Sequence, residues 1–252
     1  MDAGHPDCGS VEKKLPRMSS HPAAKLYKGT LQTLGLSKLK GRRWAHVTPR
    51  YVMNRMNLHF YQRWHPDHPW LTRHMVAILG DWLQSGDRGH EWGSGRSTVW
   101  CARNKIGELT SVEHDPAWGE TVCQLLRAEH VADKVDYHVF EQTNPDAERR
   151  YVESVQCHHD ASLDFCLVDG LLRDRCALAA LRKIKPGGIL VIDNINWFLP
   201  RQRPSHSPNS RRSAEGCASP AWQEVSAIIA PWRCIWTSDG VTDTALWVKP
   251  AT

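Results

Sequence analysis

The octapeptide EWGSGRST, residues 91–98, decides the fold, because it joins a short apolar run to a helical pattern through two glycines. Glycine permits a sharp turn and lets a ligand approach the backbone closely. The unpaired N–H groups at the start of the next helix offer a site for an anionic group. We therefore expect a ligand-binding loop at the carboxyl end of a buried strand.

Strand and helix patterns alternate on the C-terminal side of this loop. The apolar runs LTSVEHD, VDYHVF, LDFCLVDG and GGILVIDN are separated by helical patterns, among them Ala117–Glu129 and one beginning near Arg173. This alternation predicts a parallel sheet wrapped by helices, and near-continuous apolar strands are typical of burial on both faces. The later runs RCIWT and TALWV flank an Asp-Gly pair, which predicts an antiparallel hairpin.

Two helices are predicted on the N-terminal side of the loop. In Pro49–Trp64 the apolar residues recur four apart along one face, and a second helical pattern begins at Pro69 and leads up to Gly86. Residues 1–24 have no such period and are predicted to be a disordered tail. We expect residues 25–86 to form a helical extension or cap, followed by a cofactor-binding domain over residues 87–252.

One long segment inside that domain has the composition of a loop. Residues 201–220 are rich in Pro, Ser and Arg and follow a predicted strand. A long loop at the carboxyl end of a strand often covers a site, so we predict a lid here.

An acidic residue strengthens the prediction of a nucleotide-like ligand. Glu113 lies 22 residues beyond Glu91, at the end of the next predicted strand. A carboxylate there can accept hydrogen bonds from both ribose hydroxyls. The dinucleotide fingerprint has a third Gly or Ala where this chain has Thr98, so a nicotinamide cofactor is the second choice.

Four segments in this order, EWGSGRST, SVEHD, LDFCLVDG and KPGGILVIDN, resemble the motifs of class I S-adenosylmethionine-dependent methyltransferases. The resemblance implies an α/β fold: a doubly wound, mostly parallel, Rossmann-like sheet of seven strands, with S-adenosyl-L-methionine as the cofactor. It places the methionine portion over the glycine loop and the ribose on the acidic residue after the second strand. The implied cofactor-binding residues are Glu91, Gly93, Ser94, Gly95, Ser97, Glu113, His114 and Asp169.

The ends of the fourth and fifth predicted strands carry Asp169 and the pair Asp193-Asn194. Two carboxylates and an amide oxygen in one crevice suit Mg²⁺. The set resembles the metal site of catechol-type and macrocin-type O-methyltransferases. This implies Asp169, Asp193 and Asn194 as metal ligands, and Asp169 and Asp193 as catalytic residues. A metal-free site lined by the same carboxylates is the open alternative.

One departure from the catechol type limits the choice of substrate. Where that type has a basic Lys three residues after the first Asp, this chain has Leu172, followed by Arg173. Arginine stays protonated and cannot accept a proton. We therefore predict methyl transfer to a hydroxyl of another small molecule, with Mg²⁺ assistance as an option.

Charge separates the remaining function classes. Residues 1–88 have a net charge of +8, residues 89–200 of −5 and residues 201–252 of +2, within an overall +5. An acidic core suits a cationic sulfonium, and the basic surplus belongs to the N-terminal segment. The alternatives are therefore a nicotinamide-dependent oxidoreductase and a nucleic-acid-binding protein that uses this basic segment. Nucleic-acid and protein acceptors stay open, and the oligomeric state is not predicted.

The chain contains no apolar run near the roughly 18 residues of a spanning helix. Its first residues also lack the apolar core of a signal peptide. We expect no membrane span and a cytoplasmic location.

Overall fold

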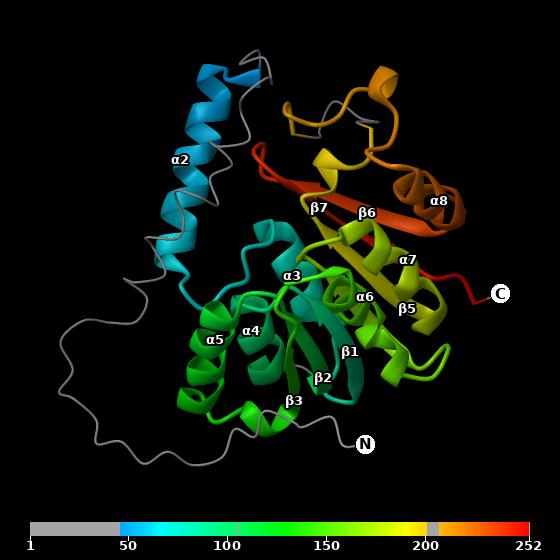
Figure 1. Cartoon of the computed structure of the whole chain (residues 1–252). Coiled ribbons are helices and arrows are strands. Elements are labelled where there is room, and N and C mark those ends of the chain that lie inside the picture. The colour runs from blue at the N-terminus through cyan, green and yellow to red at the C-terminus, as the bar shows by residue number, and fades with distance from the viewer. Residues whose placement is uncertain (1–45, 105, 201–206, 252) are drawn as a thin grey trace. The chain divides into compact units, whose positions relative to one another are not determined.

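The computed structural model describes residues 46–104, 106–200 and 207–251 (Figure 1). The chain divides into Met1–Val47 and a compact unit, Thr48–Thr252, to which every helix and strand named below belongs. The predicted tail at residues 1–24, residues 25–45 of the predicted extension and residues 201–206 of the predicted lid lie outside the described residues.

A seven-stranded sheet forms the centre of the compact unit, with the strand order β3-β2-β1-β4-β5-β7-β6. All neighbouring strands pair in parallel except β7, which is antiparallel to both β5 and β6. The predicted doubly wound, mostly parallel sheet with an antiparallel C-terminal hairpin is thereby confirmed. The strands are β1 (Asp87–Trp92), β2 (Ile106–Glu113), β3 (Val135–Val139), β4 (Leu163–Val168), β5 (Ile184–Asp193), β6 (Arg233–Ser238) and β7 (Asp243–Val248).

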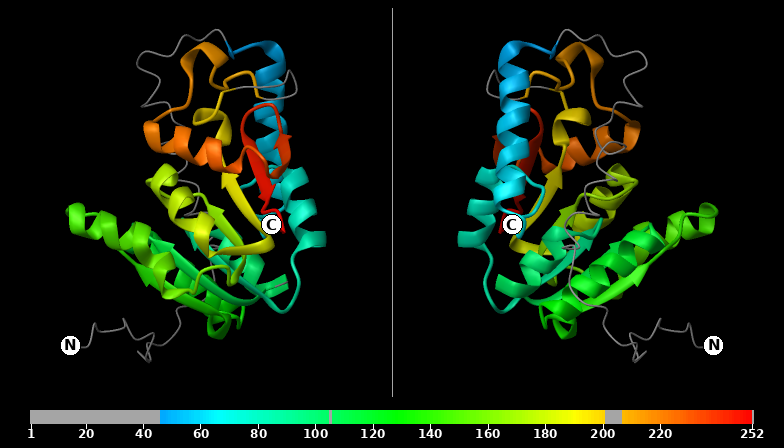
Figure 2. Two further views of the ribbon diagram at one scale, coloured as in Figure 1. Left: turned by 90° about the vertical axis from the view of Figure 1, so that its right-hand side faces the viewer. Right: turned by 90° about the vertical axis from the view of Figure 1, so that its left-hand side faces the viewer.

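Helices cover both faces of this sheet (Figures 1 and 2). Helices α3, α4 and α5 pack on one face, and α6, α7 and α8 pack on the other. Among the described residues, no helix is long and apolar enough to cross a membrane. The helices are α2 (Pro49–Trp64), α3 (Arg73–Trp82), α4 (Arg96–Asn104), α5 (Pro116–Ala128), α6 (Pro145–Glu153), α7 (Arg173–Lys183) and α8 (Pro220–Ile229).

Local capping explains where several helices begin. Asp115, Asn144 and Ser219 each accept a hydrogen bond from a main-chain N–H of the following first turn, and a proline stands at the start of each helix. Helix α6 is missing from the sequence-based prediction, because it is short and mostly charged. Only Ala147, Tyr151 and Val152 bury their side chains there.

Helix α3 begins at Arg73, and not at Pro69 as the sequence pattern predicts. Thr72 is held in an extended conformation, since its N–H donates to Thr244 Oγ1 at 3.2 Å and its hydroxyl lies 2.5 Å from Thr237 Oγ1. Tertiary hydrogen bonds to β6 and β7 therefore delay the start of the helix. From there α3 packs its apolar side against the sheet.

The strand order reverses at β1, which pairs with β2 on one side and β4 on the other. In open α/β sheets, ligands bind outside the carboxyl ends of the strands at such a switch point. A main-chain hydrogen bond of 2.9 Å from the N–H of Asp169 to the carbonyl of Trp92 joins the two strand ends. The turn after β1, residues 93–95, therefore lies against the turn after β4.

Candidate active site

Two glycines meet backbone to backbone at the switch point. Gly93 has a φ of +92°, and a Cβ placed on it would lie 2.5 Å from the main-chain nitrogen of Gly170. A Cβ on Gly170 would in turn lie 1.9 Å from the hydroxyl of Tyr151. No side chain fits at either position, so both glycines are required by packing. The sequence motif points to Gly93, whereas Gly170 is identified only by the structure.

Gly95 has a different environment, because a Cβ on it would meet Trp118 at an ordinary contact distance of 3.6 Å. The indole N–H of Trp118 donates to the carbonyl of Ser94 at 2.8 Å and so fixes the loop. The protein itself leaves room for a side chain at Gly95. A requirement for glycine there would have to come from a ligand.

Glu91 lies beneath the glycine loop and is 1% exposed. Its carboxylate accepts hydrogen bonds from the hydroxyl of Ser97, from Thr98 Oγ1 at 2.6 Å and from Ser111 Oγ at 2.8 Å. Burial raises the pKa of Glu91 to about 7, against the opposing effect of these three hydroxyls. Glu91 and Ser97 thus fasten the start of α4 to the end of β1. Direct contact of either residue with a cofactor stays a prediction.

Glu113 ends β2 and is 2% exposed. Its Oε1 accepts from the main-chain N–H groups of His114 at 2.7 Å and Asp115 at 3.0 Å, and its Oε2 accepts from Ser94 N at 3.1 Å and Ser94 Oγ at 3.0 Å. Burial raises the pKa of Glu113, but the His114 ring and these main-chain donors outweigh it and lower the pKa overall. The carboxylate is therefore held in its ionised form.

These four donors, together with the His114 ring, already use the acceptor capacity of the Glu113 carboxylate. The Ser94 hydroxyl is itself held by Tyr137, whose O–H lies 2.5 Å away. A ribose diol can bind Glu113 only if the Ser94 side chain turns aside. The partly exposed His114 ring also lies beside this carboxylate, with its Nδ1 2.7 Å from Glu113 Oε1.

Arg173 organises the ends of β4 and β5. Its guanidinium pairs with Asp169 Oδ1 at 2.8 Å and donates to the carbonyls of Asp169 at 2.6 Å and Asp193 at 2.5 Å. Its Nε donates to the carbonyl of Gly170 at 2.9 Å. Sequence reasoning saw in Arg173 only a residue that cannot act as a base. Its position four residues after Asp169, at the start of a helix, is the signal that would have identified this pair.

Asp193 and Asn194 are held from the side of β7. The Thr244 hydroxyl donates to Asp193 Oδ1 at 2.6 Å, and Asn194 Nδ2 donates to Thr242 Oγ1 at 2.6 Å. Burial raises the pKa of both Asp169 and Asp193, while Arg173 lowers it. The structure therefore places Asp169 and Asp193 around Arg173, with the Asn194 amide turned toward Thr242, and the ligand roles of these residues stay predictions. It adds Arg173 and the two threonines of the hairpin to the set.

Two residues beside this cluster have left-handed backbone conformations. Leu172 has a φ of +48° and Asn194 a φ of +52°. Asn is common in this region of conformational space, but Leu is not, and such strain concentrates at ligand sites. Leu172 directly precedes α7, and Asn194 directly follows the end of β5.

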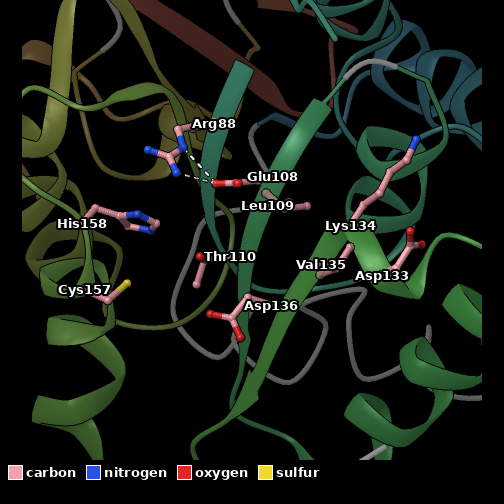
Figure 3. A pocket seen from close by; sticks show the side chains of 10 residues that line it. All are labelled: Arg88, Glu108, Leu109, Thr110, Asp133, Lys134, Val135, Asp136, Cys157 and His158. Carbon is pink, nitrogen blue, oxygen red and sulfur yellow. Dashed lines mark hydrogen bonds and ion pairs between the residues drawn. The ribbon is translucent and has the colours of Figure 1, made fainter. Parts of the chain in front are cut away.

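A groove of about 410 Å³ lies elsewhere, near the amino ends of β1, β2 and β3 (Figure 3). Arg88 and Glu108 form an ion pair of 2.8 Å on its wall. This groove lies at the amino ends of the strands, whereas the glycine loop lies at the carboxyl end of β1, so the groove is separate from the candidate site. Its wall is completed by Leu109, Thr110, Asp133, Lys134, Val135, Asp136, Cys157 and His158.

A second pocket of about 280 Å³ lies between α2, α3 and the β6–β7 turn. Asp239 Oδ1 accepts from the N–H of Thr242 at 2.9 Å, and the Thr242 hydroxyl bonds Asn194, so the pocket adjoins the cluster at the end of β5. Its walls are polar and consist of Arg50, Asn54, Asn57, Leu58, Tyr61, Arg73, His74, Ser238, Asp239 and Gly240.

A glycine loop and an acidic strand end at the switch point of an open α/β sheet form the arrangement that binds nucleotide-type cofactors. Residues 90–195, which run from β1 to just past β5, match a family model described as a methyltransferase domain. The chain therefore contains a methyltransferase domain, and this domain has a Rossmann-like fold. No curated protein matches it.

Several solved structures are similar to the chain. The O-methyltransferase TomG from Streptomyces achromogenes, involved in tomaymycin synthesis and solved in complex with S-adenosylmethionine, is 18% identical, with 92% of this chain and 91% of that chain covered and a TM-score of 0.49. A methyltransferase-like protein from Silicibacter pomeroyi is 23% identical, with 73% and 90% covered and a TM-score of 0.48. The cyclase SpnF is 14% identical, with 71% and 81% covered and a TM-score of 0.45.

The two loop glycines yield a paired prediction. Gly93→Ala should lower the melting temperature by about 5 °C or more, because the new Cβ collides with Gly170. Gly95→Ala should leave the melting temperature unchanged but weaken binding of S-adenosylhomocysteine, because only the ligand lacks room. Thermal unfolding and calorimetric titration measure the two effects. Unchanged ligand affinity in the folded Gly95→Ala variant would remove Gly95 from the cofactor site.

The raised pKa of Glu91 makes stability depend on pH. Below its ordinary value of 4.5 the group is protonated in both states, and its contribution to stability is fully present. As the pH rises toward about 7, only the unfolded chain ionises, so the contribution declines and is lost above that value. Relative to Glu91→Gln, the wild type should lose about 3 kcal/mol of unfolding free energy between pH 4.5 and pH 8.

Denaturant titrations of the wild type and Glu91→Gln at matched pH values check this. The difference between the two proteins isolates Glu91, because all other groups titrate in both. Parallel curves across this range would show that Glu91 is ionised throughout in the folded protein.

Proposed function

We propose that this enzyme transfers a methyl group from S-adenosylmethionine to a hydroxyl oxygen of a small polar molecule. The observation that carries the proposal is the juxtaposition, at one switch point, of the Gly93–Gly95 loop, the ionised Glu113 and the carboxylates of Asp169 and Asp193. These groups suit a cofactor on the β1–β2 side and an acceptor on the β4–β5 side.

The cofactor is assigned to the loop side of this crevice. S-adenosylmethionine supplies an already activated methyl group, so the protein has to align the acceptor and exclude water. Gly93, Ser94 and Gly95 line its path, and Glu113 with His114 receives the ribose and adenine. Glu91 and Ser97 support the loop from below, while Asp169 borders the methyl group from the opposite side.

The acceptor is assigned to the polar pocket between α2, α3 and the β6–β7 turn. Asp239 Oδ2 is buried there and, within the described part of the chain, has no hydrogen-bond partner. A buried acceptor atom without a donor is costly, and a hydroxyl or amino group of a ligand would satisfy it. The volume of about 280 Å³ and the Arg, His and Asn lining support a small polar acceptor over a large or apolar one.

The reaction leaves one proton to be accepted from the acceptor hydroxyl. Asp169 and Asp193 are the carboxylates of the crevice on the acceptor side. Arg173 holds the main chain of both residues in place, because its guanidinium donates to the main-chain carbonyl of each. We assign proton acceptance to this pair, with Arg173 as a positioning residue.

The Mg²⁺ site that the sequence suggests does not fit these contacts. The Arg173 guanidinium already compensates the charge of Asp169, and it would repel a cation bound to the same carboxylate. On the β5 side, the Thr244 hydroxyl already donates to Asp193 Oδ1. Among the described residues, no group of three or more His, Cys, Asp or Glu side chains is placed to hold a metal. We assign no metal to the reaction.

Other sequence-based expectations remain proposals. The lid at residues 201–220 would close over the acceptor side, and the division at residue 87 would separate the cap from the catalytic domain. A small-molecule acceptor is favoured here over nucleic acid or protein. The cytoplasmic location is likewise a proposal.

Binding of the product cofactor tests the proposed function first. S-adenosylhomocysteine at about 100 times its dissociation constant should stabilise the wild type by roughly 2.7 kcal/mol. Glu113→Gln should bind about tenfold more weakly or worse, because a charged acceptor is lost. Ser94→Ala should bind at least as well as the wild type, since no hydroxyl competes with the ribose. Calorimetric titration measures all three proteins, and labelled methyl transfer to a panel of polyhydroxy compounds then tests the acceptor class.

Chelation tests the metal-free assignment. Methyl transfer should be unchanged in excess EDTA, and added Mg²⁺ should not raise the melting temperature. Arg173→Leu should lose activity about tenfold or more, because the two strand ends lose their shared cation. Arg173→Lys, which keeps the charge but loses the planar contacts, should retain an intermediate rate. Loss of wild-type turnover in EDTA and its recovery with Mg²⁺ would reverse the assignment.

A further inference from the structure

Helix α2 turns a row of apolar side chains to solvent, and its inner side, which includes Asn54, Leu58 and Tyr61, faces the rest of the unit. The solvent side carries an apolar stripe of Val52, Met53, Met56, Phe60 and Trp64, with exposed fractions of 45%, 64%, 54%, 44% and 75%. No residue of α2 is buried. This arrangement is the reverse of that in an ordinary surface helix, whose apolar face covers the core.

The inward contacts of α2 are polar and hold it in place. Asn54 packs so tightly on the β6–β7 turn that a Cβ on Gly240 would lie 2.0 Å from Asn54 Nδ2. Arg96, at the start of α4, donates to the carbonyls of Gln62 at 3.3 Å and His65 at 3.5 Å, where α2 ends. Figures 1 and 2 show α2 beside the β6–β7 hairpin. The stripe therefore faces outward because the opposite side is anchored.

The size of the stripe is that of an interaction surface. With side-chain areas of roughly 150–250 Å² for the large residues, these exposed fractions amount to a patch on the order of 500 Å². This is at the upper end of the patches that monomers leave exposed, roughly 300–600 Å². Two such patches bury on the order of 1,000 Å², which reaches the lower limit for a specific interface.

The order of residues along the stripe identifies the occupant. Val52, Met56, Phe60 and Trp64 form one ridge of residues four apart, with the aliphatic residues in the first half and the aromatic ones in the second. Paired antiparallel about a two-fold axis midway between Met56 and Phe60, each Met56 faces Phe60 of the second copy. Val52 then faces Trp64 of the second copy. Such self-complementarity is what an isologous dimer requires, and thioether groups pack well against aromatic rings.

The charges on α2 agree with a second copy as the occupant. The helix has no acidic residue, and its basic residues are Arg50, Arg55 and Arg63. Arg50 lines the pocket that contains Asp239. Arg55 lies near the same pocket, because the charges of Arg55 and Asp239 both shift the pKa of Tyr51. Arg63 alone of the three lies beside the outward stripe. A single cation gives an anionic surface little to bind, whereas the stripe itself is apolar.

We propose that this chain forms a two-fold homodimer through the apolar stripe of α2, with the two helices antiparallel. The dimer would also fix α2 over the acceptor-side pocket that its inner face lines. The proposal stands on the exposed stripe and does not require the proposed function.

Light scattering coupled to gel filtration of the full chain tests the dimer. The wild type at about 50 µM should have twice the chain mass of 28.6 kDa. Phe60→Asp and Met56→Asp should each raise the dimer dissociation constant about 30-fold or more, as expected at the centre of an interface. Ile228→Asp, on the exposed side of α8, is the matched control and should remain dimeric, because Ile228 is similarly exposed at 43%. Circular dichroism should show the same fold in all four proteins.

Three results would overturn the proposal. The first is a monomeric wild type at 100 µM, and the second is a dimer that Phe60→Asp and Met56→Asp leave intact. The third is a wild type that is monomeric in solution but floats with vesicles of phosphatidylcholine and phosphatidylglycerol, which would assign the stripe to a lipid surface. Cofactor binding by the monomeric variants is measured separately, so that failure of the dimer and failure of the methyltransferase site are distinguishable.

Discussion

The close approach of Gly93 to Gly170 is the constraint on which the rest of the site depends. It lets the turn after β1 lie directly against the turn after β4, with main-chain atoms touching and no side chain between them. The hydrogen bond from Asp169 N to the Trp92 carbonyl has the same effect one residue earlier. Because the two turns share one position, the groups after each strand face a single crevice.

Buried carboxylates in this crevice are each matched to particular donors. Glu91 accepts hydrogen bonds from three hydroxyls and has a pKa raised to about 7. Glu113 accepts hydrogen bonds from N–H and O–H donors, and its pKa is lowered. Asp169 has the Arg173 guanidinium. Glu91 thus fastens the start of α4 to the end of β1, while Glu113 keeps an ionised carboxylate at the end of β2, because their donors differ in number and polarity.

Helix α2 connects the acceptor side with the exterior. Its inner face touches the β6–β7 turn and lines the polar pocket near Asp239, and its outer face carries the apolar stripe. This helix of 16 residues therefore has two polar anchors and one exposed apolar face. An interface formed on that face would lie across α2 from the pocket, with only this helix between them.

The sequence by itself determined the alternation of strands and helices, the hairpin and the location of the glycine loop, because periodicity and turn residues act locally. It also named Glu113, Asp169, Asp193 and Asn194, since each follows a recognisable strand. Only the tertiary structure decided which partner each of them has. Three contacts, namely Arg173 with the Asp193 carbonyl, Gly170 with Gly93, and Thr244 with Asp193, join residues 20 or more positions apart. Such pairings depend on how the strands are ordered in the sheet, which no local pattern encodes.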